Sequence, residues 1–379
     1  MAEKVYINKL SKFLPNEVVT NDEMEDYLGF VKNLKSRAKG LILRSNGIKK
    51  RYYSIDKDGN HTHTNAEMVA EAIKGLEDDT FSLKDLELLA LGTTSPDQLL
   101  PAHAQMVQGL LKNRPLEAIT PEGSCNSSLL AMKYAYMSIL CGSSTNAVSG
   151  GSERLSPWLL SKNFEDEATR LQALQKKQIV AFEKDFLRWM LSDGAAVALL
   201  ENKPNKDGIS LEINWIEIIS YSNELASCMY AGGERTDDGQ LIPWRNYSPE
   251  DLFAHGILSI KQDVKLLDEN IVKYGAQALR DVTLKHNLET KDVDFFLPHM
   301  SSEFFRDRIH TETAELGCPL NPDKWFTNLT EVGNVGSASV YLMLEELFYS
   351  GKLKKDDKVL VMSPESARFS YAFVLMTVV

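Results

Sequence analysis

Residues 118–140, AITPEGSCNSSLLAMKYAYMSIL, and residues 325–348, WFTNLTEVGNVGSASVYLMLEELF, share one layout. Each begins with a short strand-like piece, continues through a turn of small residues, and ends in an apolar helical run. Neither run has a continuous polar face, and a helix that is apolar on all sides is typical of a buried element. The two stretches therefore predict two helices in the interior of one molecule.

The repetition extends beyond these two stretches. Three further pairs of segments correspond in the same order: residues 86–95 with 293–302, residues 145–156 with 357–370, and residues 193–202 with 370–379. Strands that alternate with helices favour parallel or mixed sheets covered by helices. The sequence thus predicts an α/β protein of two duplicated halves, whose two sheets enclose the buried helices in a five-layered α-β-α-β-α sandwich.

The turn cluster KPNKDG, residues 203–208, lies near the middle of the chain and predicts the boundary between the halves. We expect an N-terminal half of residues 1–205 and a C-terminal half of residues 206–379. The first half carries an additional segment, residues 155–191, which is rich in Glu, Lys, Gln and Arg with spaced aromatic residues. Its pattern predicts one or two amphipathic helices, and such an insertion commonly forms a lid, a tunnel wall or a subunit contact.

The composition limits the classes of function. The 379 residues are 43% hydrophobic, which is enough for a large core, and their formal net charge of −11 argues against non-specific nucleic-acid binding. No apolar run reaches the roughly 18 residues that a membrane span needs. The N-terminus lacks the apolar region of a signal peptide, so a cytoplasmic protein is expected.

The sequence predicts no metal site and no disulfide framework. Its four cysteines are far apart and form no C-x-x-C pair. His61 and His63 are more typical of a polar surface turn than of a pair of metal ligands. The glycine motifs that bind nucleotides and the G-x-S-x-G motif of serine hydrolases do not occur.

Cys125 has the position of a reactive thiol. It follows Gly123 and Ser124 in a tight turn and precedes the helical run of residues 127–140. The dipole and the free amide groups at a helix N-terminus stabilise a thiolate, so this position predicts a nucleophile with a lowered pKa. A buried, unreactive cysteine is the alternative.

Two further polar residues lie at corresponding turns of the second half. His299 follows Pro298 at the end of a predicted strand, and Asn334 lies in the turn that matches the Cys125 turn. An exposed histidine at a strand end and an asparagine favoured by turn geometry are the alternatives. Since related halves place their corresponding turns at a common interface, we expect Cys125, His299 and Asn334 to converge.

In this order along the chain, the motifs resemble those of the thiolase superfamily, and most of all the ketoacyl-acyl-carrier-protein synthase III group. The resemblance rests on the cysteine turn, the Pro298–His299 pair and the string GNVGSAS, residues 333–339. It covers nearly the whole chain, with residues 155–191 and 221–260 as gaps.

The resemblance implies an acyltransferase that performs a condensation in fatty-acid or polyketide biosynthesis. An acyl group would pass from a thioester to Cys125. His299 and Asn334 would then hold the carbonyl of a malonyl- or β-ketoacyl thioester while its α-carbanion attacks the acyl group, a Claisen condensation. The backbone N–H groups of Cys125 and Arg368 would form the oxyanion hole.

The chain departs from the resemblance at three places. Ser, Ala and Arg occupy residues 366–368, where the family has glycines, and Leu41 takes the place of a tryptophan that stacks on coenzyme A. The loop QLLPAHA, residues 98–104, lacks the acidic base of the branch that condenses two long acyl chains. These departures favour a branch in secondary metabolism, such as the formation of dialkylresorcinols or cyclohexanediones.

The resemblance also implies partners. We expect a homodimer that uses acyl carrier protein or coenzyme A as the carrier of its thioester substrates, with no other cofactor and no nucleic acid or membrane partner. Because carrier proteins are acidic, basic residues are expected around the tunnel mouth. The candidates are Lys49, Lys50, Arg51, Arg306 and Arg308. Solvated surface charge is the alternative for each of them.

Two alternative functions are consistent with the same fold. The first is an acyltransferase that moves the acyl group from Cys125 to an alcohol, amine or thiol. Retention of Asn334 argues against it, because pure transfer has less need of a pair of groups that stabilises an enolate. The second is a non-catalytic subunit that shapes a partner's tunnel, which an intact Cys, His and Asn set disfavours.

Overall fold

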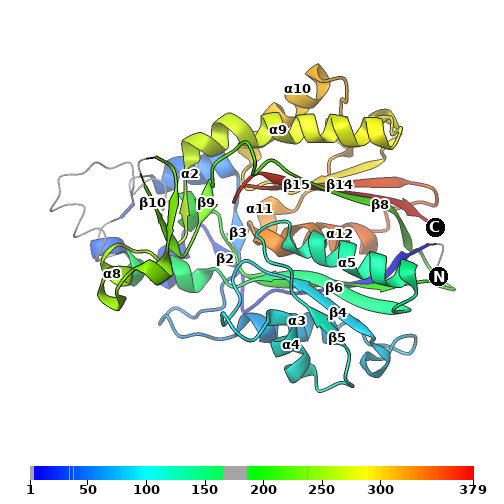
Figure 1. The fold of residues 1–379 in the computed structure, drawn as a ribbon, viewed down its shortest axis with the longest axis horizontal. Helices are drawn as coiled ribbons and strands as arrows, with labels where there is room; N and C mark the ends of the chain where they lie inside the picture. The colour runs from blue at the N-terminus through cyan, green and yellow to red at the C-terminus, as the bar shows by residue number, and fades with distance from the viewer. Residues whose placement is uncertain (1–3, 34, 37, 165–185, 237) are drawn as a thin grey trace.

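The computed structural model describes residues 4–33, 35–36, 38–164, 186–236 and 238–379 and shows a mixed α/β fold (Figure 1). Its main feature is a nine-stranded sheet in the order β13-β14-β15-β8-β1-β7-β6-β4-β5. The strands, in chain order, are β1 (Tyr6–Phe13), β4 (Leu88–Gly92), β5 (Glu117–Ile119), β6 (Asn146–Glu153), β7 (Gly194–Glu201), β8 (Leu211–Ser220), β13 (Phe295–Pro298), β14 (Lys358–Glu365) and β15 (Ser370–Val378).

The helices cover this sheet in three layers (Figure 1). Helices α5 (Ser127–Cys141) and α12 (Ser339–Tyr349) lie in the middle, between the β4–β7 part and the β13–β15 part. Helices α3 (Asn65–Lys74) and α4 (His103–Leu111) cover one outer face, and α9 (Val264–Lys285) and α10 (Arg306–Glu315) cover the other. Shorter helices are α1 (Met24–Leu28), α2 (Lys39–Asn46), α8 (Pro249–Ala254) and α11 (Leu329–Val332).

The strand pairing repeats between the halves. In the first half β4 pairs with β6 in parallel, and β6 with β7 and β7 with β1 in antiparallel fashion. In the second half β13–β14, β14–β15 and β15–β8 follow the same sequence of pairings. The counterpart of β5 is reduced to one bridge, between Phe296 and Trp325. The predicted five-layered, duplicated α/β fold is therefore confirmed.

The two halves join where β1 pairs with β8 over two residue pairs, Tyr6 with Glu212 and Ile7 with Leu211. The predicted boundary at residues 205 and 206 lies in the loop between β7 and β8. That this loop divides the chain into two domains stays a prediction.

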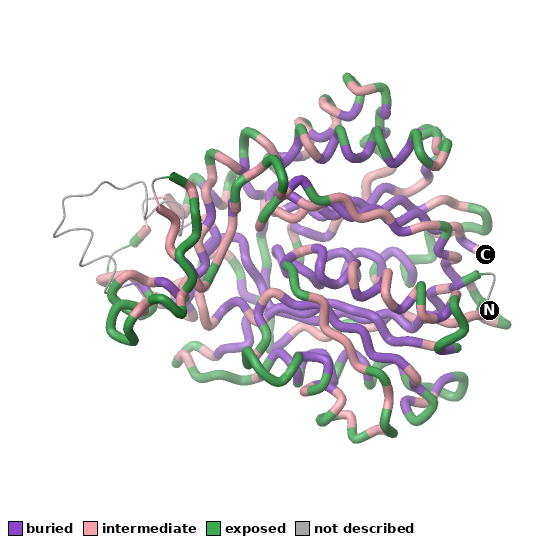
Figure 2. Tube along the Cα trace, viewed as in Figure 1, coloured by how far each residue is buried: buried purple, intermediate pink, exposed green. Residues whose placement is uncertain are grey.

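Buried residues concentrate in the middle layer and in the strands that enclose it (Figure 2). Apolar side chains of α12 are buried from Val340 to Leu344, as a helix without a polar face predicts. The prediction for α5 is only partly correct. Its N-terminal end is buried, but Met137 is 46% exposed and Cys141 is exposed, because one side of the C-terminal half of α5 is not covered.

Most of the insertion predicted to be helical, residues 165–185, lies outside the described residues. Residues 221–263, which we call the capping segment, lie at the end of the middle layer where α5 and α12 begin (Figure 1). The capping segment contains α8 and four short strands, β9 (Met229–Tyr230), β10 (Gly233–Arg235), β11 (Leu241–Pro243) and β12 (Lys261–Gln262), of which β9 pairs with β12 and β10 with β11. A further short pair joins β2 (Val19–Thr20) and β3 (Lys50–Arg51).

Candidate active site

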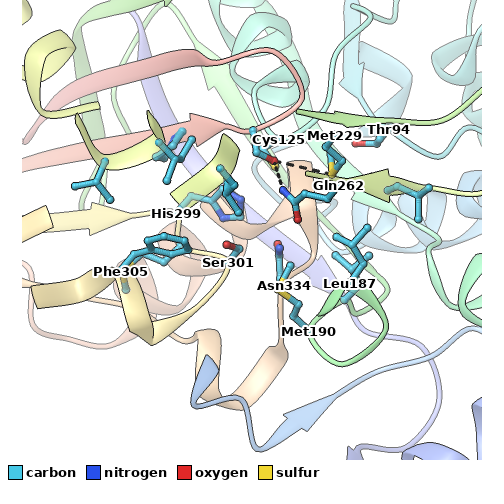
Figure 3. A pocket seen from close by; sticks show the side chains of 18 of the residues that line it. Thr94, Cys125, Leu187, Met190, Met229, Gln262, His299, Ser301, Phe305 and Asn334 are labelled. Carbon is cyan, nitrogen blue, oxygen red and sulfur yellow. Dashed lines mark hydrogen bonds between the residues drawn. The ribbon is translucent and has the colours of Figure 1, made fainter. Parts of the chain in front are cut away.

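Cys125, His299 and Asn334 line one pocket, in which the two halves and the capping segment meet (Figure 3). Its polar lining residues are Thr94, Cys125, Gln262, His299, Ser301, Asn334 and Ser366. The remaining lining is apolar and comes mainly from Leu, Ile, Met and Val side chains. Among the described residues that line the pocket there is no Asp, Glu, Lys or Arg. The convergence predicted from the duplicated turns is thus present in the structure.

Cys125 lies at the turn that precedes α5 and is partly accessible. The amides of its two neighbours, Ser124 and Asn126, donate to Glu365 Oε2 at 3.0 and 3.2 Å. These amides were expected to be free to stabilise a thiolate, and the structure corrects that expectation. Burial raises the pKa of the Cys125 thiol, and the carboxylates of Glu365 and Glu153 raise it further. The resting group is therefore a neutral thiol.

His299 is held by the second half of the sheet. It follows β13, and its backbone N–H donates to the carbonyl of Met362 on β14 at 2.8 Å. The side chain is 5% exposed, and burial lowers the pKa of His299 to about 4. Because desolvation disfavours the imidazolium, His299 is neutral at pH 7 and presents one N–H donor and one lone pair.

Asn334 is fixed by three hydrogen bonds. Its backbone N–H donates to Met190 at 3.0 Å, and its carbonyl accepts from Ser192 at 2.9 Å. The side-chain Oδ1 accepts from the amide of Gly336 at 3.0 Å. Since Oδ1 is engaged in this way, the Nδ2 group is the part of the amide left to donate to a ligand in the pocket. The close passage of Ser192 also explains Gly333, because a Cβ there would lie 2.8 Å from the Ser192 side chain.

Hydrogen bonds across the middle layer connect the Cys125 turn with the Asn334 turn. Ser128 Oγ, in the first turn of α5, donates to the carbonyl of Ser337 at 2.6 Å. The Tyr341 hydroxyl donates to the carbonyl of Ser128 at 3.2 Å. The buried Glu153 carboxylate accepts from the amides of Thr94 and Ser337, both at 3.1 Å. The spacing of the two turns is therefore set by buried contacts between the halves.

The arrangement suits a nucleophile with two neutral donors. A thiol that attacks a thioester forms an acyl-cysteine, and two N–H groups in an apolar, uncharged pocket stabilise negative charge that develops on a carbonyl oxygen. A carboxylate placed in the same pocket would lose its hydration without gaining a cation.

Arg368 is not among the residues that line the pocket, although Ser366, two residues earlier, is. Residues 366–369 form the turn between β14 and β15, where Ser366 lines the pocket and the Arg368 side chain is exposed. The Cys125 amide donates to no other described residue. The oxyanion hole assigned to the amides of Cys125 and Arg368 stays a prediction.

The basic residues expected at the entrance differ in their surroundings. Arg51 is fully buried, with Nη1 donating to Asn21 at 2.8 Å, so it belongs to the interior and not to a surface rim. Lys50 pairs with Glu331 at 2.7 Å and Arg306 with Glu303 at 2.6 Å, while Arg308 contacts Asp268. Lys49 is exposed. For the four surface residues a role in carrier binding stays a prediction.

Some residues of the site were not predicted. Glu153 and Glu365 act on Cys125 through charge, and Gln262 lines the pocket from β12. Glu153 lies within the repeated segment of residues 145–156, but nothing in its spacing indicates that it is buried near the cysteine. Gln262 directly follows a segment without recognisable motifs, and a strand of two residues leaves no periodic signal.

Other kinds of site find no support in the described residues. Within them, no three His, Cys, Asp or Glu side chains come together as metal ligands would. No helix in the described part of the chain combines the length and hydropathy that crossing a bilayer requires.

Two family descriptions match the chain. "Beta-ketoacyl synthase, N-terminal domain" matches residues 117–205, which include Cys125. "3-Oxoacyl-acyl-carrier-protein synthase III C terminal" matches residues 284–376, which include His299 and Asn334.

Curated relatives with a similar description match the chain over almost their whole length. The chain is 25% identical over 352 residues to a beta-ketoacyl-acyl-carrier-protein synthase III of Clostridium perfringens, covering 92% of each chain. It is 24% identical over 350 residues to the protein of that name from Aquifex aeolicus, again covering 92% of each.

Solved structures share the fold. The tetronic acid condensing enzyme AbyA1 matches with a TM-score of 0.77 at 18% identity, covering 98% of this chain and 99% of that one. OleA of Xanthomonas campestris matches with a TM-score of 0.74 at 17% identity, covering 99% and 98%. The synthase III structure from Aquifex aeolicus matches with a TM-score of 0.70 at 20% identity, covering 98% and 99%.

Proposed function

The chain belongs to the β-ketoacyl-acyl-carrier-protein synthase III-like condensing enzymes of the thiolase superfamily, and we propose that it joins two acyl units through an acyl-Cys125 intermediate. One observation carries the proposal. A thiol and two neutral N–H donors meet in a pocket whose described lining holds no charged side chain.

The first step is acyl transfer. The Cys125 sulfur attacks the carbonyl of an acyl thioester, the bond from that carbonyl to the carrier sulfur breaks, and the carrier leaves as its thiol with the proton from Cys125. The neutral imidazole of His299 has a lone pair with which to relay this proton. Covalent capture divides one difficult condensation into two easier steps.

The second step forms the carbon–carbon bond. A malonyl thioester places its carbonyl oxygen between the N–H donors of His299 and Asn334 and loses its carboxylate as CO₂. The electron pair of the broken bond forms an enolate, whose α-carbon attacks the acyl-Cys125 carbonyl and expels the Cys125 thiolate, which takes up a proton. An uncharged pocket disfavours the desolvated carboxylate, while the two N–H donors stabilise the enolate to which its negative charge moves on release of CO₂.

A malonyl unit fits the pocket best as the second substrate. Removing a proton from an unactivated α-carbon would need a base, and no carboxylate occurs among the lining residues that the structure describes. A β-ketoacyl unit is the other candidate, because its α-proton is more acidic and neutral His299 is the only described lining side chain with a basic nitrogen lone pair.

The carrier is proposed to be an acyl carrier protein or coenzyme A, and the enzyme a homodimer. The names of the curated relatives include the acyl carrier protein as substrate carrier. Lys49, which is exposed, and the partly paired Lys50, Arg306 and Arg308 are the proposed contacts of an acidic carrier.

We place the reaction in secondary lipid or polyketide metabolism, such as dialkylresorcinol formation. Support comes from residues 366–368, where side chains replace the glycines of the family and Ser366 lines the pocket. A primary fatty-acid starter enzyme has no evident need of this change.

Substituting Asn334→Ala separates condensation from plain acyl transfer. We expect acyl-Cys125 to form at a rate within a few-fold of wild type, while the β-ketoacyl product made with malonyl carrier protein falls about 100-fold or more, as for the loss of an oxyanion donor. Intact-protein mass spectrometry measures the first reaction and product mass spectrometry the second.

Asn214→Ala, the same change at an exposed residue of β8, is the control and should affect neither reaction. Condensation at the wild-type rate in Asn334→Ala would contradict the proposal. Transfer of the acyl group to an alcohol, amine or thiol, with no carbon–carbon product, would establish the acyltransferase alternative instead.

A further inference from the structure

Gln262 is one of the polar lining side chains of the pocket that have no role in the reaction proposed above. It is 3% exposed, and Figure 3 shows its amide reaching into the space among Cys125, His299 and Asn334. Its surroundings are apolar, with Met190, Met229 and Ile260 among the lining side chains. A buried amide at this position interacts directly with whatever the pocket holds.

One end of the amide is satisfied and the other is not. Gln262 Nε2 donates to Ser366 Oγ at 3.1 Å, and the Ser366 hydroxyl is directed to the Met229 sulfur at 4.0 Å (Figure 3). Gln262 Oε1 is buried and has no hydrogen-bond partner among the described residues. A buried carbonyl without a donor is destabilising, so a fixed one in a pocket indicates a donor on the ligand.

The backbone around Gln262 is fixed, and the hydrogen bond from Nε2 to Ser366 orients the side-chain amide. Gln262 pairs with Met229 in the β9–β12 ladder. The next residue, Asp263, caps α9 by accepting from the Leu266 amide at 2.9 Å, and its own N–H donates to the Cys228 carbonyl at 2.8 Å. A side chain held in this way discriminates between ligands with little cost of reordering.

We propose that Gln262 Oε1 accepts a hydrogen bond from an O–H or N–H group on the acyl chain that Cys125 carries, so that the first substrate is a donor-bearing acyl thioester such as a hydroxyacyl group. This inference rests on the proposed acyl-Cys125 intermediate and names its substrate class. A carboxylate is excluded as the partner of Oε1, because both groups are acceptors. The amide N–H groups of a pantetheine arm offer the same donor chemistry, and the test below distinguishes this second source.

The test compares matched acyl thioesters in which a hydroxyl replaces a terminal methyl group: glycolyl with propanoyl, 3-hydroxypropanoyl with butanoyl, and 4-hydroxybutanoyl with pentanoyl. Each is supplied as the pantetheine thioester and as the simple S-ethyl thioester. The rate of acyl-Cys125 formation is followed by intact-protein mass spectrometry in wild type, Gln262→Leu and the control Gln105→Leu, which makes the same change on the exposed side of α4. The ratio of rates within a pair is the readout, since a general loss of activity cancels from it.

We expect wild type and Gln105→Leu to load the hydroxyl member of at least one pair about tenfold faster, the effect of one hydrogen bond. The preference should hold for both thioester forms and disappear in Gln262→Leu. If the ratio of rates within each pair were the same in wild type and Gln262→Leu, the proposal would be overturned. The proposed function would stand in that case, because Cys125 would still be acylated. A second result would also overturn the proposal: Gln262→Leu lowers the rate of acyl-Cys125 formation equally for both members of each pair, and only with pantetheine thioesters. That result would make the pantetheine arm the donor to Oε1. Absence of any adduct would overturn the proposed function itself, and this inference with it.

Discussion

At the scale of single residues, the pocket keeps its reactive groups uncharged. Burial makes both the Cys125 thiolate and the His299 imidazolium unfavourable, so in the resting state a thiol and a neutral imidazole line the same pocket. A neutral histidine is the form that both donates to a developing enolate and retains a lone pair. The charge balance therefore suits condensation better than a preformed thiolate–imidazolium pair would.

Glu365 contributes to this balance, and its removal has a testable effect. Glu365→Gln retains a side-chain oxygen for the amides of Ser124 and Asn126 but removes a negative charge that raises the pKa of Cys125. We expect Cys125 to react about tenfold faster with iodoacetamide at pH 8, because the thiolate fraction rises as the pKa falls. Peptide mapping separates Cys125 from the exposed Cys141.

Glu122→Gln is the matched control, since Glu122 is an exposed carboxylate of the same turn. Its effect on the alkylation rate should stay below about twofold, because solvent screens an exposed charge. An unchanged rate in Glu365→Gln would show that Glu365 has no electrostatic influence on the thiol.

The sequence identified the three converging side chains but not the groups that tune them. Cys125, His299 and Asn334 follow motifs at corresponding turns, and duplication brings such turns together. Glu365 lies in a segment that departs from the family pattern, and its contact with the Cys125 turn spans 241 residues of sequence. Contacts of this kind depend on how β14 meets α5, which local sequence patterns do not encode.

At the scale of elements, a buried aspartate joins β7 to the start of the inserted segment. Asp193 precedes β7 and is completely buried. Its carboxylate accepts from the amides of Ser54, Leu155 and Ser156 at 2.7, 2.6 and 2.9 Å, and also from the two serine hydroxyls. These bonds hold the chain where it leaves β6 and where it returns.

Asp193→Ala should lower the free energy of unfolding by about 3 kcal/mol or more, because it leaves several buried amides without an acceptor. Urea unfolding followed by circular dichroism measures the change. Asp207→Ala, at an exposed position of the loop between β7 and β8, should alter the free energy by no more than about 0.5 kcal/mol. A comparably small effect of Asp193→Ala would contradict this structural role.

Elements with strong local patterns could be predicted, and weakly patterned ones could not. Apolar runs such as LLALG of β4 and GAAVALLE of β7 are recognisable as buried strands. The prediction that α5 is buried on all sides was too broad, because helix composition does not tell which side lacks a neighbour. The two-residue strands of the capping segment have no periodicity from which to predict them.

At the scale of the whole molecule, burial of neutral histidines makes stability depend on pH. His103, the first residue of α4, is 3% exposed, and burial lowers its pKa from 6.5 to about 4. Above pH 6.5 neither the folded nor the unfolded state binds a proton there. As the pH falls from 6.5 to 4, only the unfolded state becomes protonated, so stability is lost within this window.

For His103 alone the loss between pH 7 and pH 5 amounts to about 2 kcal/mol. His103→Asn is expected to be less stable than wild type at pH 7, since it loses the contact with Ser152 at 3.1 Å. The gap should narrow by about 2 kcal/mol at pH 5, because the variant lacks the titrating group. Urea unfolding of both proteins at the two pH values measures this, and a gap that stays constant would contradict a buried neutral His103.

The overall architecture could be predicted because the two halves of the chain contain the same order of elements. Each half repeats the parallel, antiparallel, antiparallel order of pairings, so the pattern of either half supports the assignment of the other. The capping segment takes the place between β8 and α9 that residues 14–64 take between β1 and α3, but the two segments contain different short elements. The position of Gln262 in the pocket, on which the proposed substrate class rests, therefore could not be predicted from the sequence.

The central claim is that Cys125 carries the acyl group, and intact-protein mass spectrometry tests it most directly. The protein and its Cys125→Ala variant are incubated with acyl and hydroxyacyl thioesters of an acyl carrier protein and of coenzyme A, and malonyl carrier protein is then added. The account predicts a mass gain equal to one acyl group in wild type, absent from Cys125→Ala, that disappears on addition of the malonyl donor as a β-ketoacyl product forms. The same mass gain in Cys125→Ala, or an adduct that malonyl carrier protein fails to discharge, would contradict it.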